Sequence, residues 1–191
     1  MDSIIKLNED LQSAVGEEYQ NRKWVPGSGI TTAPVVLVGE APGAKEELEG
    51  LPFVGAAGKH LTNFLGHAKL TRKQLYITNV VKIRPFRLSP KTNKAVNRPP
   101  NSDELLFFTP FLMRELQIIK PKLVVTLGNV PLRALTGNKK AVIGRLHGRL
   151  LRHGFLLFPL YHPASVIYNS SLKEVYLKDL EVLSELVREG L

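Results

Sequence analysis

The sequence predicts an α/β protein, a three-layer α/β/α sandwich with a central, mainly parallel, four-stranded sheet. Four short apolar runs rich in β-branched residues recur along the 191 residues, and helical stretches separate them. Near-continuous apolar runs are typical of parallel strands covered on both faces. Strands that alternate with helices are typical of a sheet between two helical layers. No repeat or linker interrupts the pattern, so we expect residues 1–191 to form one domain.

The elements follow in order. A first amphipathic helix is expected at residues 3–18, where apolar residues recur at helical spacing. The four strands are expected at residues 35–38, 75–81, 123–127 and 155–161. The later helices are expected at residues 57–67, 102–119, 130–135 and 172–187, the second of them beginning at Ser102 with Glu104 in its first turn.

The charge balance is strongly basic. Lys and Arg number 26 against 17 Asp and Glu, which gives a net charge of +9. Such a surface favours a polyanion by counterion release and electrostatic steering, although excess lysine on an ordinary soluble protein gives the same count. Nucleic acid is therefore the partner class that composition favours.

Cysteine is absent, which excludes disulfides, thiolate nucleophiles and metal or iron–sulfur sites built on cysteine. We expect no metal and no cofactor. The N-terminus lacks the pattern of a signal peptide, and no run approaches the roughly 18 apolar residues of a membrane span. A soluble, cytoplasmic monomer without a membrane partner is expected.

Two polar groups follow predicted strands directly. Glu40 lies in the turn GEAPG at residues 39–43, after the first strand, and His162 follows the last strand and precedes Pro163. In an open α/β sheet, ligand sites lie beyond the carboxyl ends of the strands. A glutamate in a Gly/Pro turn or a lone histidine is often only a surface or structural residue, but at one sheet edge the two become candidates for catalysis.

Two further residues fit the recognition of a flat ligand. Phe53 lies in the glycine-rich string GLPFVGAAG at residues 50–58, and it either fills the core or offers a rigid stacking face. Asn79 interrupts an otherwise apolar strand, so its amide needs partners. It either caps local backbone or pairs with an imide edge such as uracil O4 and N3–H.

The segment 84–101 is expected to be an irregular surface loop, because it is dense in charge and contains four prolines. It is either a solvated loop or a basic lip along a phosphate backbone. Its basic residues are Arg84, Arg87, Lys91, Lys94 and Arg98.

Together these strings resemble the uracil-DNA glycosylase superfamily, and most closely its family 4 branch. The matching motifs occur in the family's order and cover about residues 20–187. They are GEAPG at 39–43, GLPFVGAAG at 50–58, TNVVK at 78–82 with Arg84-Pro85, NRPP at 97–100, PKLVVTLG at 121–128 and YHPA at 161–164.

This chain departs from the family pattern at several positions. Family 4 proteins usually hold a [4Fe–4S] cluster on four cysteines. Here Ile83 stands where the resemblance places one cysteine, Phe108 stands near another, and two more fall between residues 8 and 15. Apolar side chains at these positions would fill the volume. Tyr168 stands near a position where relatives often have arginine.

The resemblance implies hydrolysis of the N-glycosidic bond of deoxyuridine in DNA after base flipping. The flipped uracil would stack on Phe53, and Asn79 would read its pairing edge. His162 would donate a hydrogen bond to O2. Glu40 would stabilise the sugar cation or position the water, which the sequence leaves open.

The backbone of Gly39 and Ala41 would add hydrogen bonds to uracil. Ser165, Val166 and Ile167 would contact DNA, the last two as an apolar wedge that fills the gap in the duplex.

Rival functions remain at this stage. The excised base could be hypoxanthine or xanthine, or the chain could bind DNA or RNA without catalysis. A phosphate-binding nucleotide protein fits poorly, because neither glycine-rich string has the Lys-Ser/Thr of a P-loop or Gly-x-Gly-x-x-Gly spacing.

Overall fold

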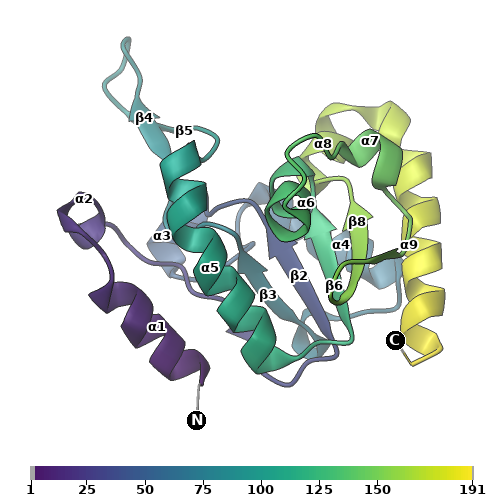
Figure 1. Ribbon diagram of the computed structural model, residues 1–191. Coiled ribbons are helices and arrows are strands. Elements are labelled where there is room, and N and C mark those ends of the chain that lie inside the picture. The colour runs from purple at the N-terminus through teal and green to yellow at the C-terminus, as the bar shows by residue number, and fades with distance from the viewer. Residues whose placement is uncertain (1–2, 191) are drawn as a thin grey trace.

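The computed structural model describes residues 3–190, and its main sheet has six strands in the order β1-β3-β2-β6-β8-β7 (Figure 1). The four inner strands run parallel to one another. They are β3 (Tyr76–Asn79), β2 (Val35–Gly39), β6 (Leu123–Leu127) and β8 (Leu156–Leu160). These are the four strands that the apolar runs predict, so the parallel core of the predicted sheet is confirmed.

The sheet is wider than predicted because an antiparallel strand borders each edge. They are β1 (Ser28–Gly29) beside β3 and β7 (Leu151–Arg152) beside β8. Each has only two residues, so neither leaves an apolar run in the sequence. The predicted strand at 75–81 ends at Asn79, although the N–H groups of Val80 and Val81 still donate to the carbonyls of Gly39 and Glu40 at 2.9 and 3.1 Å.

Side chains that alternate along each strand pack into two separate apolar layers. In β2, Val36 and Val38 join one buried cluster, whereas Val35 and Leu37 join the other. This is the two-residue period of a strand, and burial of both faces explains why the run reads as continuously apolar.

Helices cover both faces of the sheet. The first layer contributes side chains from α1 (Ile4–Ser13), α5 (Ser102–Ile119), α6 (Asn129–Thr136) and α7 (Ile143–Leu146). The second contributes them from α4 (Ala56–His67), α8 (Pro163–Tyr168) and α9 (Lys173–Arg188). Four short helices complete the chain, namely α2 (Glu17–Gln20), α3 (Ala44–Glu49), η1 (Arg72–Gln74) and η2 (Ser170–Leu172). The predicted α/β/α sandwich is confirmed.

Helix boundaries follow local capping. Helix α5 has the predicted bounds because Asn101 and Glu104 cap each other: the Glu104 N–H donates to Asn101 Oδ1 and the Asn101 N–H donates to Glu104 Oε2, both at 2.8 Å. The single first helix expected at residues 3–18 is instead divided into α1 and α2, with Gly16 capping the second.

The segment 84–101 forms a β-hairpin, and the expectation of an irregular loop is wrong. Strands β4 (Phe86–Leu88) and β5 (Ala95–Asn97) pair antiparallel in a separate two-stranded sheet. The prolines lie outside the paired residues, so they do not interrupt the ladder. The hairpin projects from the body beyond the N-terminal end of α5 (Figure 1).

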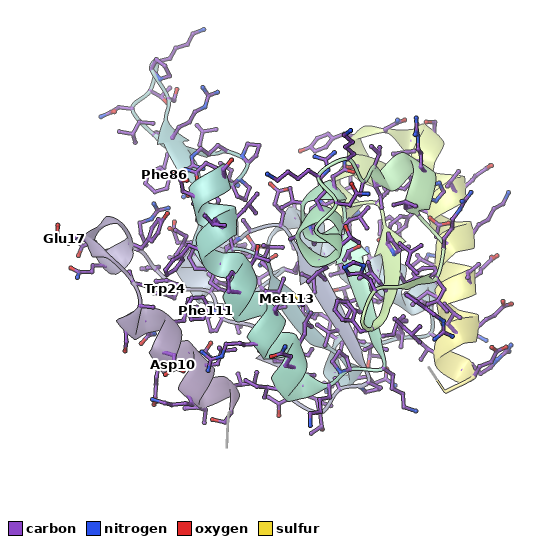
Figure 2. All side chains as sticks on the ribbon, viewed as in Figure 1. Asp10, Glu17, Trp24, Phe86, Phe111 and Met113 are labelled. Carbon is purple, nitrogen blue, oxygen red and sulfur yellow. The ribbon has the colours of Figure 1, made fainter. Side chains whose placement is uncertain are left out.

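Apolar side chains pack around the positions where the resemblance places cluster cysteines. Ile83 and Phe108 are fully buried in one core cluster that also holds Leu11 of α1. The Phe108 ring centroid lies 5.6 Å from that of Trp24 and 6.0 Å from that of Tyr19. Figure 2 shows Trp24 and Phe111 between the N-terminal helices and α5. We call Tyr19, Trp24, Phe107 and Phe108 the aromatic cluster.

Candidate active site

Phe53, Asn79 and His162 gather at the carboxyl edge of the sheet. They line one cleft of about 390 Å³, to which Ala41 and Asn97 also contribute. The rings of Phe53 and His162 lie 6.1 Å apart between centroids and are inclined by 33°. Residues from five separate segments of the chain therefore face one small space beyond the carboxyl ends of the parallel strands.

A glycine at position 39 allows this close approach. A Cβ atom added to Gly39 would lie 2.4 Å from Asn79 Oδ1 and 2.5 Å from Phe53 Cζ. Any larger residue would therefore displace the amide or the ring. The side chains of Asn79 and Phe53 therefore pack directly against the backbone of Gly39.

The backbone at Phe53 is held in the left-handed region, with φ of 55°. For a bulky residue this conformation is costly and persists only where its surroundings enforce it. The Glu46 carboxylate accepts hydrogen bonds from the N–H groups of Val54 at 3.0 Å and Gly55 at 2.7 Å. The Arg72 guanidinium donates to the carbonyls of Pro52 at 2.9 Å and Phe53 at 3.0 Å.

Glu46 also accepts a hydrogen bond from the Gly43 N–H at 3.2 Å. One carboxylate thus ties the turn after β2 to the loop that carries Phe53, while Arg72 holds the same loop from its carbonyl side. We call Glu46 and Arg72 the loop clamp. Burial lowers the pKa of Arg72 from its ordinary value.

Asn79 is 2% exposed, and within residues 3–190 its side-chain amide makes no hydrogen bond to the protein. Its backbone is fixed, because Lys82 Nζ donates to the Asn79 carbonyl at 2.8 Å. The same ammonium donates to Glu115 Oε2 at 2.7 Å, and the Tyr76 hydroxyl donates to Glu115 Oε1 at 2.8 Å. A buried ion pair therefore anchors the end of β3 while the amide is left for a ligand.

His162 precedes α8 and caps its first turn. The Ala164 N–H donates to His162 Nδ1 at 3.2 Å. Burial lowers the pKa of His162 from its ordinary value, so the ring is neutral at pH 7. A neutral imidazole that accepts at Nδ1 carries its proton on Nε2, which makes Nε2 a hydrogen-bond donor.

Glu40 is half-buried and lines a second cavity of about 500 Å³. This cavity adjoins the first, since Ala41, Gly43, Asn97 and His162 line both. Burial raises the pKa of the Glu40 carboxyl. The two residues first singled out for catalysis thus meet at one junction, with Glu40 on the side away from Phe53.

The predicted DNA-binding residues divide into two groups. Arg84 pairs with Glu47 at 3.2 Å and donates to Asn97 Oδ1 at 2.7 Å. Arg98 makes a bidentate ion pair with Glu104 at 2.7 and 2.8 Å. Both arginines hold the base of the hairpin through these pairs, which gives them a structural role in place of the expected phosphate contacts.

Arg87, Lys91 and Lys94 are exposed on the projecting hairpin. Phe86 anchors its base, where the guanidinium carbon of Arg22 lies 4.5 Å from the ring centroid (Figure 2). Unlike Arg84 and Arg98, these three basic side chains do not hold the base of the hairpin in place.

On α8, Ser165 and Ile167 are exposed, the latter at 40%. Val166 is 5% exposed and packs in the second apolar layer. The expectation that Val166 acts as a wedge is therefore wrong: the side chain faces the core and holds the helix in place.

Sequence reasoning missed four residues of the site. Arg72 carries no local signal, because Pro52 and Phe53 are far from it in the chain. Glu46 is local only to Gly43, and nothing near it in the sequence indicates its bonds to Val54 and Gly55. Asn97 belongs to the NRPP string, which was matched without a role for it. Tyr168 was noted only as a departure from the family pattern, yet it lines the cleft.

Across residues 3–190, no three His, Asp or Glu side chains are grouped as metal ligands. No helix in that part of the chain has the length and apolarity needed to cross a bilayer.

The profile of the uracil DNA glycosylase superfamily matches residues 26–183. The chain belongs to this superfamily. The resemblance seen in its motifs is therefore confirmed. Curated relatives match an even larger share of the chain.

A type-4 uracil-DNA glycosylase of Sulfurisphaera tokodaii is 38% identical over 197 residues, which cover 97% of this chain and 86% of the relative. One of Archaeoglobus fulgidus is 39% identical, covering 97% and 94%. One of Thermotoga maritima is 34% identical, covering 86% and 83%.

Proposed function

We propose that this protein hydrolyses the N-glycosidic bond of deoxyuridine in DNA and releases uracil. The observation that carries the proposal is the convergence of Phe53, Asn79 and His162 on one cleft, each with chemistry for a different part of a flipped uracil. The names of the curated relatives support the same activity.

Recognition falls to Phe53 and Asn79. The Phe53 ring offers one face for stacking. The Asn79 amide can donate to uracil O4 and accept from N3–H, whereas cytosine presents an amine and a bare nitrogen at these positions. A buried amide without protein partners loses hydrogen bonds when the wrong base enters, which makes discrimination strong.

His162 acts on the leaving group. When the bond between C1′ and N1 breaks, its electron pair leaves with the base and negative charge develops toward O2. The neutral ring with its proton on Nε2 would donate a hydrogen bond to that oxygen. The hydrogen bond from the Ala164 N–H to His162 Nδ1 fixes the tautomer with the proton on Nε2. The Nε2 donor is therefore in place before the substrate binds.

Glu40 acts on the sugar. Positive charge develops on the deoxyribose, and a carboxylate beside it either stabilises the cation or orients the water that attacks C1′. Both roles need the ionised carboxylate.

The hairpin provides the phosphate contacts through Arg87, Lys91 and Lys94. We also propose that the protein acts as a monomer in the cytoplasm on single- or double-stranded DNA. Replacing Lys91 and Lys94 with Gln should weaken DNA binding and reduce the salt slope by about one unit for each lysine. A matched pair, the exposed Lys139 and Lys140 replaced with Gln, should leave the slope unchanged; equal slopes for both pairs would argue against a hairpin contact.

Uracil-containing oligonucleotides, single-stranded and duplex, test the activity through alkali cleavage at the abasic product. His162→Ala should slow excision by roughly 10²- to 10³-fold, the scale of one lost oxyanion donor, while DNA affinity persists. His153→Ala, at an exposed histidine, is the matched control. A fully active, folded His162→Ala protein would contradict the mechanism.

The same assay with hypoxanthine and xanthine substrates sets the base range. Release of one of these bases without uracil release would replace uracil as the substrate. A tight, salt-sensitive DNA complex with no base release would favour a binding protein.

A further inference from the structure

A lysine and a glutamate that the proposed mechanism does not use are buried beneath the end of β3. The side chains of Lys82 and Glu115 are only 4% and 2% exposed, and Lys82 Nζ lies 2.7 Å from Glu115 Oε2. Replacing a buried ion pair with apolar residues is often neutral or stabilising, because both charges must leave water. Stability alone therefore does not account for this pair, and its contacts indicate another role.

The ammonium of Lys82 uses all three of its N–H groups. They donate to Glu115 Oε2, to the Thr78 hydroxyl and, at 2.8 Å, to the Asn79 carbonyl. The Tyr76 hydroxyl donates to the other carboxylate oxygen at 2.8 Å. We call Tyr76, Thr78, Lys82 and Glu115 the buried polar network. Because every member has a hydrogen-bond partner, the network holds one arrangement.

The buried polar network reaches the cleft through the peptide group between Asn79 and Val80. The carbonyl of this group accepts from Lys82, and its N–H donates to the Gly39 carbonyl at 2.9 Å. The Asn79 amide itself has no hydrogen bond to the protein within residues 3–190, and it packs against Gly39. The direction of the amide therefore depends on how this peptide group is held, and Lys82 provides one of the two hydrogen bonds that hold it.

We propose that Lys82 is a positioning residue for base selection and that Glu115 holds its ammonium in place. The inference rests on the proposed function, in which the Asn79 amide reads the pairing edge of the flipped base. Uracil and cytosine differ at that edge in the direction of two hydrogen bonds, and such bonds weaken steeply when their angles are poor. A tilted amide loses its bonds to uracil, so the preference for uracil over cytosine falls.

A replacement that removes both charges tests the proposal. The double variant Lys82→Met/Glu115→Gln removes the hydrogen bond to the Asn79 carbonyl and leaves no buried charge without a partner. Met has nearly the shape of the lysine stem. Gln can still accept from the Tyr76 hydroxyl and donate to the Thr78 hydroxyl.

The measured quantity is the ratio of affinities for uracil and cytosine. Each base is placed in the same duplex as its 2′-fluoro nucleotide, because fluorine disfavours the sugar cation and so keeps the base attached. The ratio should fall by about 10-fold in the double variant, the scale of one hydrogen bond lost at a buried group, and single-turnover release of uracil should slow by a similar factor. Val81→Ala is the matched control: it opens a cavity at a fully buried position next to Val80, keeps the network and should keep the wild-type ratio.

Asn79→Ala shows whether Lys82 acts through the amide. In that background, adding Lys82→Met/Glu115→Gln should leave the ratio unchanged, because the group that it positions is gone. Three results would overturn the inference: a folded double variant with the wild-type ratio, an equal fall in Val81→Ala, or a further fall in the Asn79→Ala background.

A second variant covers the case in which the double variant does not fold. Tyr76→Phe/Lys82→Met/Glu115→Leu replaces the three side chains with apolar ones of similar size, and it enters the same comparison. A wild type that releases no uracil contradicts the proposed function, and the affinity ratios still decide the role of Lys82. A wild type that binds the two bases equally would overturn that role, because no base is then selected.

Discussion

Replacing Glu46 with Gln should disable the Phe53 platform without unfolding the protein. The carboxylate accepts hydrogen bonds from Gly43, Val54 and Gly55 at 3.2, 3.0 and 2.7 Å, and the last two directly follow the strained backbone of Phe53. A glutamine keeps one acceptor oxygen, loses the charge and turns an NH₂ group toward one of these donors. The loop then loses the bonds that enforce φ of 55°.

The magnitude follows from the bonds lost. A hydrogen bond to a charged group is worth about 1.5–3 kcal/mol, and a neutral acceptor roughly half as much. Because Glu46 is only half-buried, water replaces part of the loss, and we expect about 2 kcal/mol against the ordered loop. If only the ordered loop is competent, excision slows by up to about 30-fold.

The assay combines single-turnover uracil release at 25 °C with thermal unfolding. A loss of about 2 kcal/mol lowers Tm by roughly 4–8 °C in a protein of this size, which leaves the chain folded at 25 °C. Glu49→Gln is the matched control, because Glu49 lies on the same helix α3 and makes only an exposed ion pair with Lys45 at 3.5 Å. Equal excision rates for Glu46→Gln and Glu49→Gln would refute the reasoning.

Three more predictions concern the cleft itself. Gly39→Ala should cost about 1–3 kcal/mol of unfolding free energy, since its methyl group overlaps Asn79 and the Phe53 ring, and should reduce uracil release far more than the Tm change explains. Asn79→Asp should lose uracil excision, because an ionised carboxylate cannot donate to O4, and residual activity should shift toward cytosine in a two-substrate competition assay. Excision measured against pH should rise and then stay level up to pH 9, because Glu40 and His162 both work in their deprotonated forms. Since burial raises the pKa of Glu40, the acid limb should lie above the ordinary glutamate value of 4.5; a decline between pH 7 and 9 in excision at saturating DNA would contradict this assignment.

Features whose signals lie within one helix or strand could be predicted from the sequence. The inner strands could be predicted because burial of both faces leaves continuous apolar runs, and α5 could be predicted because its cap lies within four residues. Glu40 and His162 could be placed together because parallel strands end at one edge, whereas Asn79 was placed with them through the resemblance.

Features that depend on contacts between residues far apart in the sequence could not be predicted. Arg72 lies nineteen residues from Phe53, and their hydrogen bond exists only after the loop folds back. A six-residue helix shows no periodicity, so the sequence could not reveal that Val166 faces inward while Tyr168 faces water. The density of charge at residues 84–101 did not indicate a hairpin in which Arg84 pairs with Glu47 and Arg98 pairs with Glu104.

The aromatic cluster gives the N-terminal helices a distinctive thermal response. They are joined to α5 by buried apolar contacts around Phe108 and by a partly exposed ion pair between Asp10 and Arg114 at 3.0 Å. Apolar contacts weaken on cooling and strengthen in sulfate, whereas ion pairs at the surface are screened by salt. Because the chain has no cysteine, no disulfide links the N-terminal helices to α5. The stability of this contact therefore depends mainly on the hydrophobic effect. Its protection against hydrogen exchange should fall as the temperature approaches 0 °C and recover when sulfate is added.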